Sequence, residues 1–90
     1  MNKTLKIAQK NGTKEVKVYL IGEIFGEKIF VHESEWDEHR FIVSEYKTGG
    51  YIPCGVQSNP KKALDAAIEF LSDKEKKFKK SILESSQINF

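Results

Sequence analysis

Apolar and polar residues alternate along the first half of the chain, in short stretches that turn residues separate. This period of two is typical of strands that bury one face. Asn11 and Gly12 tolerate positive φ and predict a tight hairpin turn between the first two stretches. The alternation predicts strands over residues 4–9, 15–21, 27–32, 40–46 and 50–54. We expect these stretches to form an antiparallel meander of four or five strands.

At two places, glycine and proline residues allow more than one path for a predicted strand. Gly22 and Gly26 bracket residues 23–25, which form either a short turn with an exposed apolar tip or a bulged continuation of a strand. Pro53 cannot donate a hydrogen bond to a neighbouring strand, so the last strand is expected to lie at a sheet edge or to end there.

The spacing of apolar residues changes to three and four beyond residue 60, which is typical of a helix with one buried face. Asn59 provides the expected N-cap, and Pro60 at the first helical position loses no hydrogen bond that the helix needs. The buried stripe is expected to contain Leu64, Ala67, Ile68 and Leu71. We therefore predict a helix over residues 60–71 that packs on one face of the sheet. The other face is expected to be partly polar, with Lys6, Lys17 and Tyr19 on it.

The chain is expected to be one domain of the α+β class, because ninety residues leave no room for a second core. Residues 1–72 form the α+β domain in this interpretation, and residues 73–90 form a charged helical C-terminal extension of it. Ser72 and Glu75 have the spacing of a capping box, so the first helix continues or a second one starts there, over residues 73–84.

Three features of the sequence bear on where the protein resides. The first residues lack the apolar run of a secretory signal. No stretch approaches the roughly 18 apolar residues that a membrane span needs. Cys54 is the only cysteine and cannot form an internal disulfide, which favours a reducing compartment. We therefore expect a cytoplasmic protein that does not enter a membrane.

Motifs of catalysis and cofactor binding are absent from the sequence, which contains no nucleophile elbow, phosphate loop or dinucleotide fingerprint. Cys54 lies shortly before the predicted helix, and a helix N-terminus can lower the pKa of a thiol. A base for this thiol would have to be His32 or His39, and a half-buried core cysteine is the favoured interpretation. We expect no enzymatic activity and no cofactor.

Residues 33–38, which we call the acidic segment, hold four carboxylates and the only tryptophan of the chain. With His32 and His39 beside them, these residue types suit a metal ion, but their spacing matches no compact metal motif. Trp36 either folds back over the edge of the core or meets a partner. Tryptophan is enriched at binding hot spots, and a negative rim favours a basic partner surface. The predicted partner-binding residues are Glu33, Glu35, Trp36, Asp37 and Glu38.

Five lysines lie within seven residues near the C-terminus, and we call them the lysine stretch: Lys74, Lys76, Lys77, Lys79 and Lys80. They could contact nucleic-acid phosphates or another anionic surface. The aromatic platforms on which single strands could stack are Tyr19, Tyr46 and Tyr51. An ordinary solvated helix face is the alternative. Arg40 stands alone against fourteen lysines, which makes sequence-specific reading of DNA a poor fit.

These features predict a small non-enzymatic binding protein that occupies a surface on a larger protein. Inhibitors from phages and other mobile elements that block host defence nucleases, the anti-CRISPR type among them, fit this profile of size and charge. The expected partner is a protein, and one that binds nucleic acid suits the acidic segment. A nucleic-acid-binding protein that uses the lysine stretch is one alternative. A homodimer is another, with an edge strand or the residues Ile24, Phe25, Phe78 and Ile82 buried between the copies.

Overall fold

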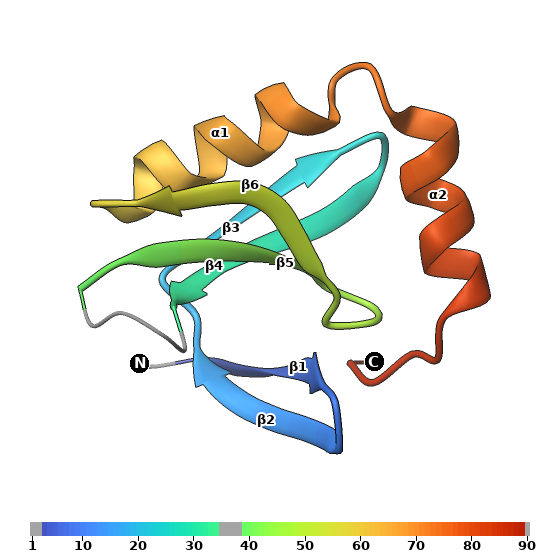
Figure 1. Cartoon of the computed structure of the whole chain (residues 1–90), viewed down its shortest axis with the longest axis horizontal. Coiled ribbons are helices and arrows are strands. Elements are labelled where there is room, and N and C mark those ends of the chain that lie inside the picture. The colour runs from blue at the N-terminus through green and yellow to red at the C-terminus, as the bar shows by residue number, and fades with distance from the viewer. Residues whose placement is uncertain (1–2, 35–38, 90) are drawn as a thin grey trace.

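In residues 3–34 and 39–89, which this computed structural model describes, the chain forms six strands and two helices (Figure 1). The strands are β1 (Thr4–Gln9), β2 (Gly12–Lys17), β3 (Leu20–Ile24), β4 (Glu27–Glu33), β5 (Phe41–Glu45) and β6 (Tyr51–Gln57). The helices are α1 (Pro60–Leu71) and α2 (Glu75–Glu84). The strands form two antiparallel sheets, a hairpin of β1 and β2 and a larger sheet of the other four strands. Together with the helices, these sheets confirm the predicted α+β class. No helix in this part of the chain has the length and apolar character that crossing a membrane requires.

The larger sheet is a meander in the order β3-β4-β5-β6. Phe25 and Gly26 form the turn between β3 and β4, with φ of 56° and 79°. Of the two paths considered for residues 23–25, the structure therefore has the turn, but its apolar side chains are not exposed. Ile24 is buried, and Phe25 packs against the core. Pro53 lies in β6, which is an edge strand as expected.

The single strand predicted over residues 15–21 is divided in the structure between β2 and β3, which belong to different sheets. The amide of Val18 bonds to the carbonyl oxygen of Lys3, at 2.9 Å, and so still belongs to the hairpin of β1 and β2. The next amide, that of Tyr19, bonds to the carbonyl oxygen of Val31 in β4, at 2.8 Å. Apolar and polar side chains keep alternating where the chain passes from one sheet to the other, so the sequence pattern resembles that of one strand.

Helix α1 covers one face of the larger sheet, as predicted (Figure 1). The side chain of Asn59 caps it by accepting a hydrogen bond from the amide three residues on, at 2.9 Å. The buried side chains of the helix are Ala63, Ala67 and Leu71. Ile68 was expected in this stripe but is 37% exposed, because the contact with the sheet follows those three positions at a spacing of four.

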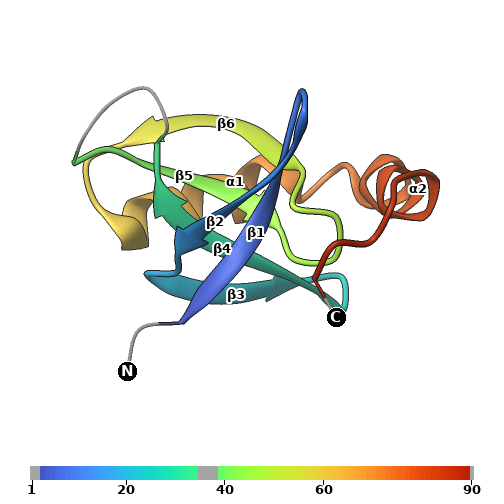
Figure 2. The same ribbon diagram turned by 90° about the horizontal axis from the view of Figure 1, so that it is seen from below.

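The hairpin of β1 and β2 covers the opposite face of the sheet and crosses its strands (Figure 2). Phe30 and His32 of β4 are fully buried there, and β1 packs its buried side chains on Phe30. The centre of this face is partly polar, as expected, because His32 and Ser44 lie on it, but it is buried beneath the hairpin. Lys6 and Lys17 are exposed on the hairpin itself, because it is a separate layer that supplies the outer surface.

Helix α2 packs on the same core as α1 through two buried side chains, Phe78 and Ile82. The capping box predicted for Ser72 and Glu75 does not form. The hydroxyl of Ser72 instead donates to the carbonyl oxygen of Glu69, at 2.8 Å, and so ends α1. No side chain caps the start of α2.

Candidate interaction site

Of the predicted contact residues in the acidic segment, only Glu33 lies within the described residues. The predicted contact residues outside them are Glu35, Trp36, Asp37 and Glu38. Glu33 ends β4, and its carboxylate accepts a hydrogen bond from the hydroxyl of Tyr19. The Tyr19 ring packs edge-on against Phe41, with ring centres 5.0 Å apart, and Nζ of Lys17 lies 5.0 Å from the Tyr19 ring centre. The acidic segment therefore starts from a defined cluster of aromatic and charged side chains.

The charge of Glu33 is stabilised by its neighbours. The hydrogen bond from Tyr19 lowers the pKa of Glu33 from its ordinary value, because it favours the carboxylate form. Desolvation opposes this change, whereas the backbone amide of His39 and the charges of His39 and Lys17 lower the pKa further. The same hydrogen bond raises the pKa of Tyr19, together with desolvation and the charge of Glu33. Glu33 is therefore negatively charged at neutral pH.

The lysine stretch begins just before α2 and follows this helix. It forms three ion pairs: Lys74–Asp73 at 2.9 Å, Lys79–Glu75 at 3.3 Å and Lys80–Glu84 at 3.8 Å. Lys76 and Lys77 have no ion pair with any described residue. Acidic neighbours thus reduce the field that the stretch presents to a phosphate backbone.

An apolar groove of about 310 Å³ lies between the start of β6, the end of α1 and α2. Its walls are formed mainly by Ile52, Pro53, Phe70, Phe78 and Ile82. Ser81 of α2 also lines it and is exposed. A hollow lined by aromatic and aliphatic side chains is the usual form of a site that receives an apolar group.

Two members of the lysine stretch, Lys74 and Lys77, also line this groove. Nζ of Lys74 donates to the carbonyl oxygen of Phe70, at 3.0 Å, near the end of α1, where carbonyl groups lack helical partners. The same Nζ lies 4.5 Å from the centre of the Phe70 ring. Lys77 is exposed. The groove therefore combines apolar walls with the charge of Lys77, which has no ion pair in the described part, and with Lys74, which is paired with Asp73.

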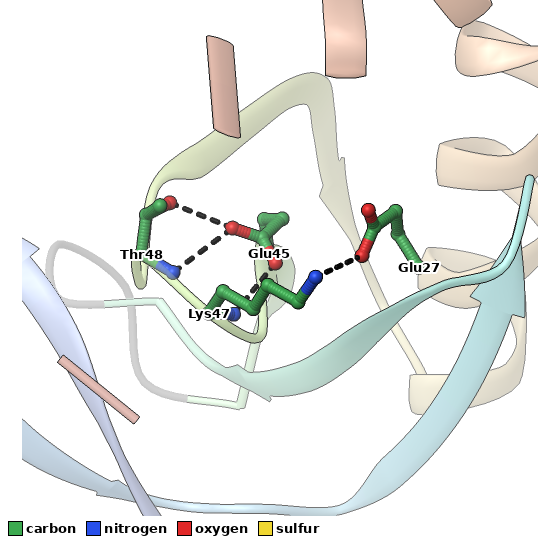
Figure 3. Close-up of polar contacts among 4 residues, drawn as sticks. All are labelled: Glu27, Glu45, Lys47 and Thr48. Atoms are coloured by element: carbon green, nitrogen blue, oxygen red, sulfur yellow. Dashed lines mark hydrogen bonds and ion pairs between the residues drawn. The ribbon is translucent and has the colours of Figure 1, made fainter. Parts of the chain in front are cut away.

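A buried carboxylate organises the turn between β5 and β6 at one end of the groove. Glu45 is 3% exposed, and its carboxylate accepts hydrogen bonds from the amides of Lys47 and Thr48, at 2.6 Å and 2.9 Å (Figure 3). The hydroxyl of Thr48 donates to the same carboxylate at 2.7 Å. Nζ of Lys47 in turn forms an ion pair with Glu27 at the start of β4, at 3.0 Å. Glu45 therefore fixes the shape of the groove through its turn.

A second cavity, of about 540 Å³, lies beside the turn of the hairpin, and His32 and Ser44 line it. Nε2 of His32 is 2.8 Å from the hydroxyl of Ser44, and Nδ1 is 3.0 Å from the carbonyl oxygen of Glu33. In the neutral ring, Nδ1 donates to that carbonyl and Nε2 accepts from Ser44. A serine beside a histidine can be an activated nucleophile. Here His32 is 0% and Ser44 2% exposed, so their hydrogen bond has a structural role in the core.

The thiol of Cys54 shows no sign of activation. Cys54 is half-buried in β6, and desolvation raises the pKa of its thiol against a smaller opposite effect of its own backbone. A reactive cysteine needs the opposite change. Among residues 3–34 and 39–89, no three His, Cys, Asp or Glu side chains gather where they could hold a metal ion. His32 is enclosed in the core, whereas His39 is exposed.

Comparison of the chain with protein families, curated proteins and solved structures gives no match. The function must therefore be argued from the surface of this chain. Its most distinctive concave feature is the apolar groove, which the sequence reasoning missed because it forms between three separate elements. One signal pointed to it: Phe70 is a large apolar residue outside the predicted stripe of α1.

Proposed function

We propose that this chain is a small non-enzymatic binding protein that acts by occupying a surface on a larger protein. The observation that carries the proposal is the apolar groove between β6, α1 and α2, with Lys74 and Lys77 beside it. Large apolar side chains that enter well-packed pockets supply much of the binding energy of protein interfaces.

The size and charge of the groove suit a protein segment. Its volume of about 310 Å³ is at the lower end of the range for ligand pockets, which fits an apolar anchor side chain better than a large cofactor. Lys77 would then face acidic residues that flank this anchor, because complementary charges set the orientation and the partner.

Strand β6 adds a second mode of contact next to the groove. It lies at the end of the strand order, so its outer edge has no neighbouring strand in the described part of the chain. Tyr51 and Val56 of β6 are 44% and 38% exposed. An extended segment of a partner can add to such an edge through main-chain hydrogen bonds, while one of its side chains enters the groove.

The finer form of the proposal is an inhibitor of a host defence nuclease, carried by a phage or another mobile element and active in the cytoplasm. Its basis is size, charge and the lack of a catalytic motif in the sequence. In this form the acidic segment around Trp36 is a second contact surface that faces the basic groove of a nuclease. The two surfaces can be tested separately in the same experiment.

The test is affinity capture of the tagged protein from a host-cell lysate, with and without nuclease treatment. Ser81→Trp fills the apolar groove from an exposed position of α2, and Ser86→Trp places the same side chain beyond the helix as a control. We expect a discrete protein to be captured by the wild type and the control after nuclease treatment. Ser81→Trp should lower the capture at least about tenfold, which corresponds to roughly 1.4 kcal/mol.

Two further variants test the acidic segment: Trp36→Ala, and Glu35→Lys combined with Asp37→Lys. If these abolish capture while Ser81→Trp does not, the contact surface is the acidic segment and the groove proposal is wrong. If nuclease treatment removes every captured protein, the chain does not act on a protein surface directly.

A homodimer through the predicted apolar residues has less surface to use. Ile24, Phe78 and Ile82 are buried in the core of the single chain, and Phe25 is partly buried against it. A dimer would then have to use an edge strand such as β6. Sedimentation over a range of concentrations tests this directly, and a mass that stays monomeric excludes a homodimer.

A further inference from the structure

The hairpin of β1 and β2 carries most of the excess positive charge of the molecule. Residues 3–17 contain five lysines and one glutamate, a net charge of +4, whereas the whole chain has +2 and the remainder therefore −2. We call these residues the hairpin lysines: Lys3, Lys6, Lys10, Lys14 and Lys17. All of them are exposed.

The hairpin lysines are not neutralised in the way that the lysine stretch is. None of them forms an ion pair with another residue of the described part, and only Lys17 has a charge interaction with an acid, Glu33. Lys3 and Lys17 lie over the rings of Tyr46 and Tyr19, at 5.8 Å and 5.0 Å from the ring centres. The only acid of the hairpin, Glu15, accepts a hydrogen bond from Thr4.

The strand register divides the two faces of the hairpin. Leu5 and Val16 are paired and lie on the inner face, next to Phe30 of the sheet. The residues of the opposite, outer face are Thr4, Lys6, Ala8, Thr13, Glu15 and Lys17. The turn between β1 and β2 adds Lys10. Figure 2 shows the ribbon of this turn reaching past β6 in that view.

The hairpin is also held firmly against the rest of the molecule. The amide of Ala8 donates to the carbonyl oxygen of Gly49, at 2.9 Å. The side chain of Asn89 bonds to both the amide and the carbonyl oxygen of Lys6, at 2.9 Å and 2.8 Å. The positive charges are therefore presented by a fixed two-stranded ribbon.

We propose that this ribbon binds the phosphates of duplex nucleic acid without reading the base sequence. The major groove of B-DNA admits a two-stranded β-ribbon. Six residues per strand give a ribbon about 20 Å long, and a duplex carries one negative charge per roughly 1.7 Å of its axis. Lysine is a point charge that contacts phosphates without the planar fork used to read guanine.

A membrane surface fits the ribbon less well. Binding at a lipid interface needs apolar side chains that enter the acyl region beside the basic ones. The outer face has none larger than Ala8, and the turn residues Lys10 and Asn11 are polar. This second surface is separate from the apolar groove, so the inference goes beyond the proposed protein-binding function.

The test is fluorescence anisotropy with a labelled DNA duplex of about 20 base pairs, between about 50 mM and 200 mM salt. The test variant replaces Lys6, Lys10 and Lys17, the lysines of the outer face and the turn, by Gln. The charge-matched control replaces Lys61, Lys62 and Lys76 by Gln, three exposed lysines of the helical side. Three lost phosphate contacts should lower the steepness of the log–log salt dependence by up to about 2.7, while the control stays near the wild type.

Two further measurements keep the test independent of folding. Replacing Lys6, Lys10 and Lys17 by Arg retains the charge and should restore binding. In nitrogen-15-labelled wild type, added duplex should shift amide signals of residues 3–17. The proposal is overturned by equal loss in the control, by shifts confined to α2, by tighter binding of single strands, or by binding to anionic lipid vesicles and not to duplex.

Discussion

The side chain of Asn89 pairs with the main chain of Lys6, 83 positions earlier in the sequence, as a neighbouring strand would. Its Oδ1 accepts from the amide of Lys6 at 2.9 Å, and its Nδ2 donates to the carbonyl oxygen of Lys6 at 2.8 Å. The same Nδ2 donates to the carbonyl oxygen of Tyr46, at 2.8 Å. One side chain thus joins the C-terminal tail, the hairpin and the turn after β5.

Asn89→Ala should destabilise the protein by about 1–3 kcal/mol, because it leaves partly buried backbone groups of Lys6 and Tyr46 without their partner. Urea unfolding of the variant measures this loss, with Ser86→Ala, an exposed residue nearby in sequence, as the control. Hydrogen exchange should also become faster at the amide of Lys6. Equal stability of the two variants would contradict the role of the tail.

Glu45→Gln should destabilise the fold more than Glu27→Gln. The first removes a buried carboxylate that accepts three hydrogen bonds, and a bond to a charged acceptor contributes about 1.5–3 kcal/mol. The second breaks only the ion pair with Lys47, whose side chain is 45% exposed, and such pairs contribute about 0–1 kcal/mol. Thermal unfolding of the two variants compares them, and the reverse order would refute this account of the turn.

Gly49→Ala should be far more damaging than Gly26→Ala, although both glycines have positive φ, 65° and 79°. A Cβ at Gly49 would lie 2.7 Å from Cα of Ile7 and from the carbonyl oxygen of Lys6, which are backbone atoms of β1. At Gly26 nothing lies within 4 Å. We expect a difference of about 1–3 kcal/mol in the free energy of unfolding. Similar values would mean that β1 does not pack closely on this turn.

Tyr19→Phe should alter the pH dependence of stability at both ends of the range. Folding lowers the pKa of Glu33 from 4.5, chiefly through the hydrogen bond from Tyr19. The contribution of Glu33 to folding stability is therefore fully present above pH 4.5 and is lost as the pH falls through the folded pKa. Folding raises the pKa of Tyr19 from 10.0, chiefly through the same hydrogen bond. The contribution of Tyr19 to folding stability is therefore fully present below pH 10.0 and is lost as the pH rises through the folded pKa.

The stability difference between the wild type and Tyr19→Phe should therefore be largest near neutral pH and smaller at about pH 3 and pH 11. Urea unfolding at these three values measures it. NMR titration of the Glu33 carboxylate should also give a higher pKa in the variant. An unchanged titration would show that the hydrogen bond does not hold the charge of Glu33.

The parts of the fold that the sequence predicted well depend on local signals. Asn59 and Pro60 placed the start of α1, because capping and a fixed φ act within a few residues. The division between β2 and β3 after Lys17 was not visible, because neither glycine nor proline marks it and the side-chain period continues. Which sheet a strand joins is decided by pairing across the fold.

The candidate surfaces could be predicted only where they are continuous in sequence, as the lysine stretch is. The apolar groove needs Ile52, Phe70 and Phe78 side by side, and nothing local indicates that a helix following Ser72 turns back toward β6. The hairpin lysines are continuous in sequence, but the acids that follow balance residues 1–57 to zero charge when they are counted together. Only the fold shows that the hairpin is a separate layer with a surface of its own.

The central claim is that the groove between β6, α1 and α2 receives part of a larger protein. The most direct test places a photo-activated cross-linking residue at Ser81, inside the groove, and in a second sample at Ser86, beyond it. We predict a covalent product with one partner protein from position 81, joined at an apolar side chain beside acidic residues, and little or none from position 86. Equal yields from both positions, or no product from position 81, would contradict the claim.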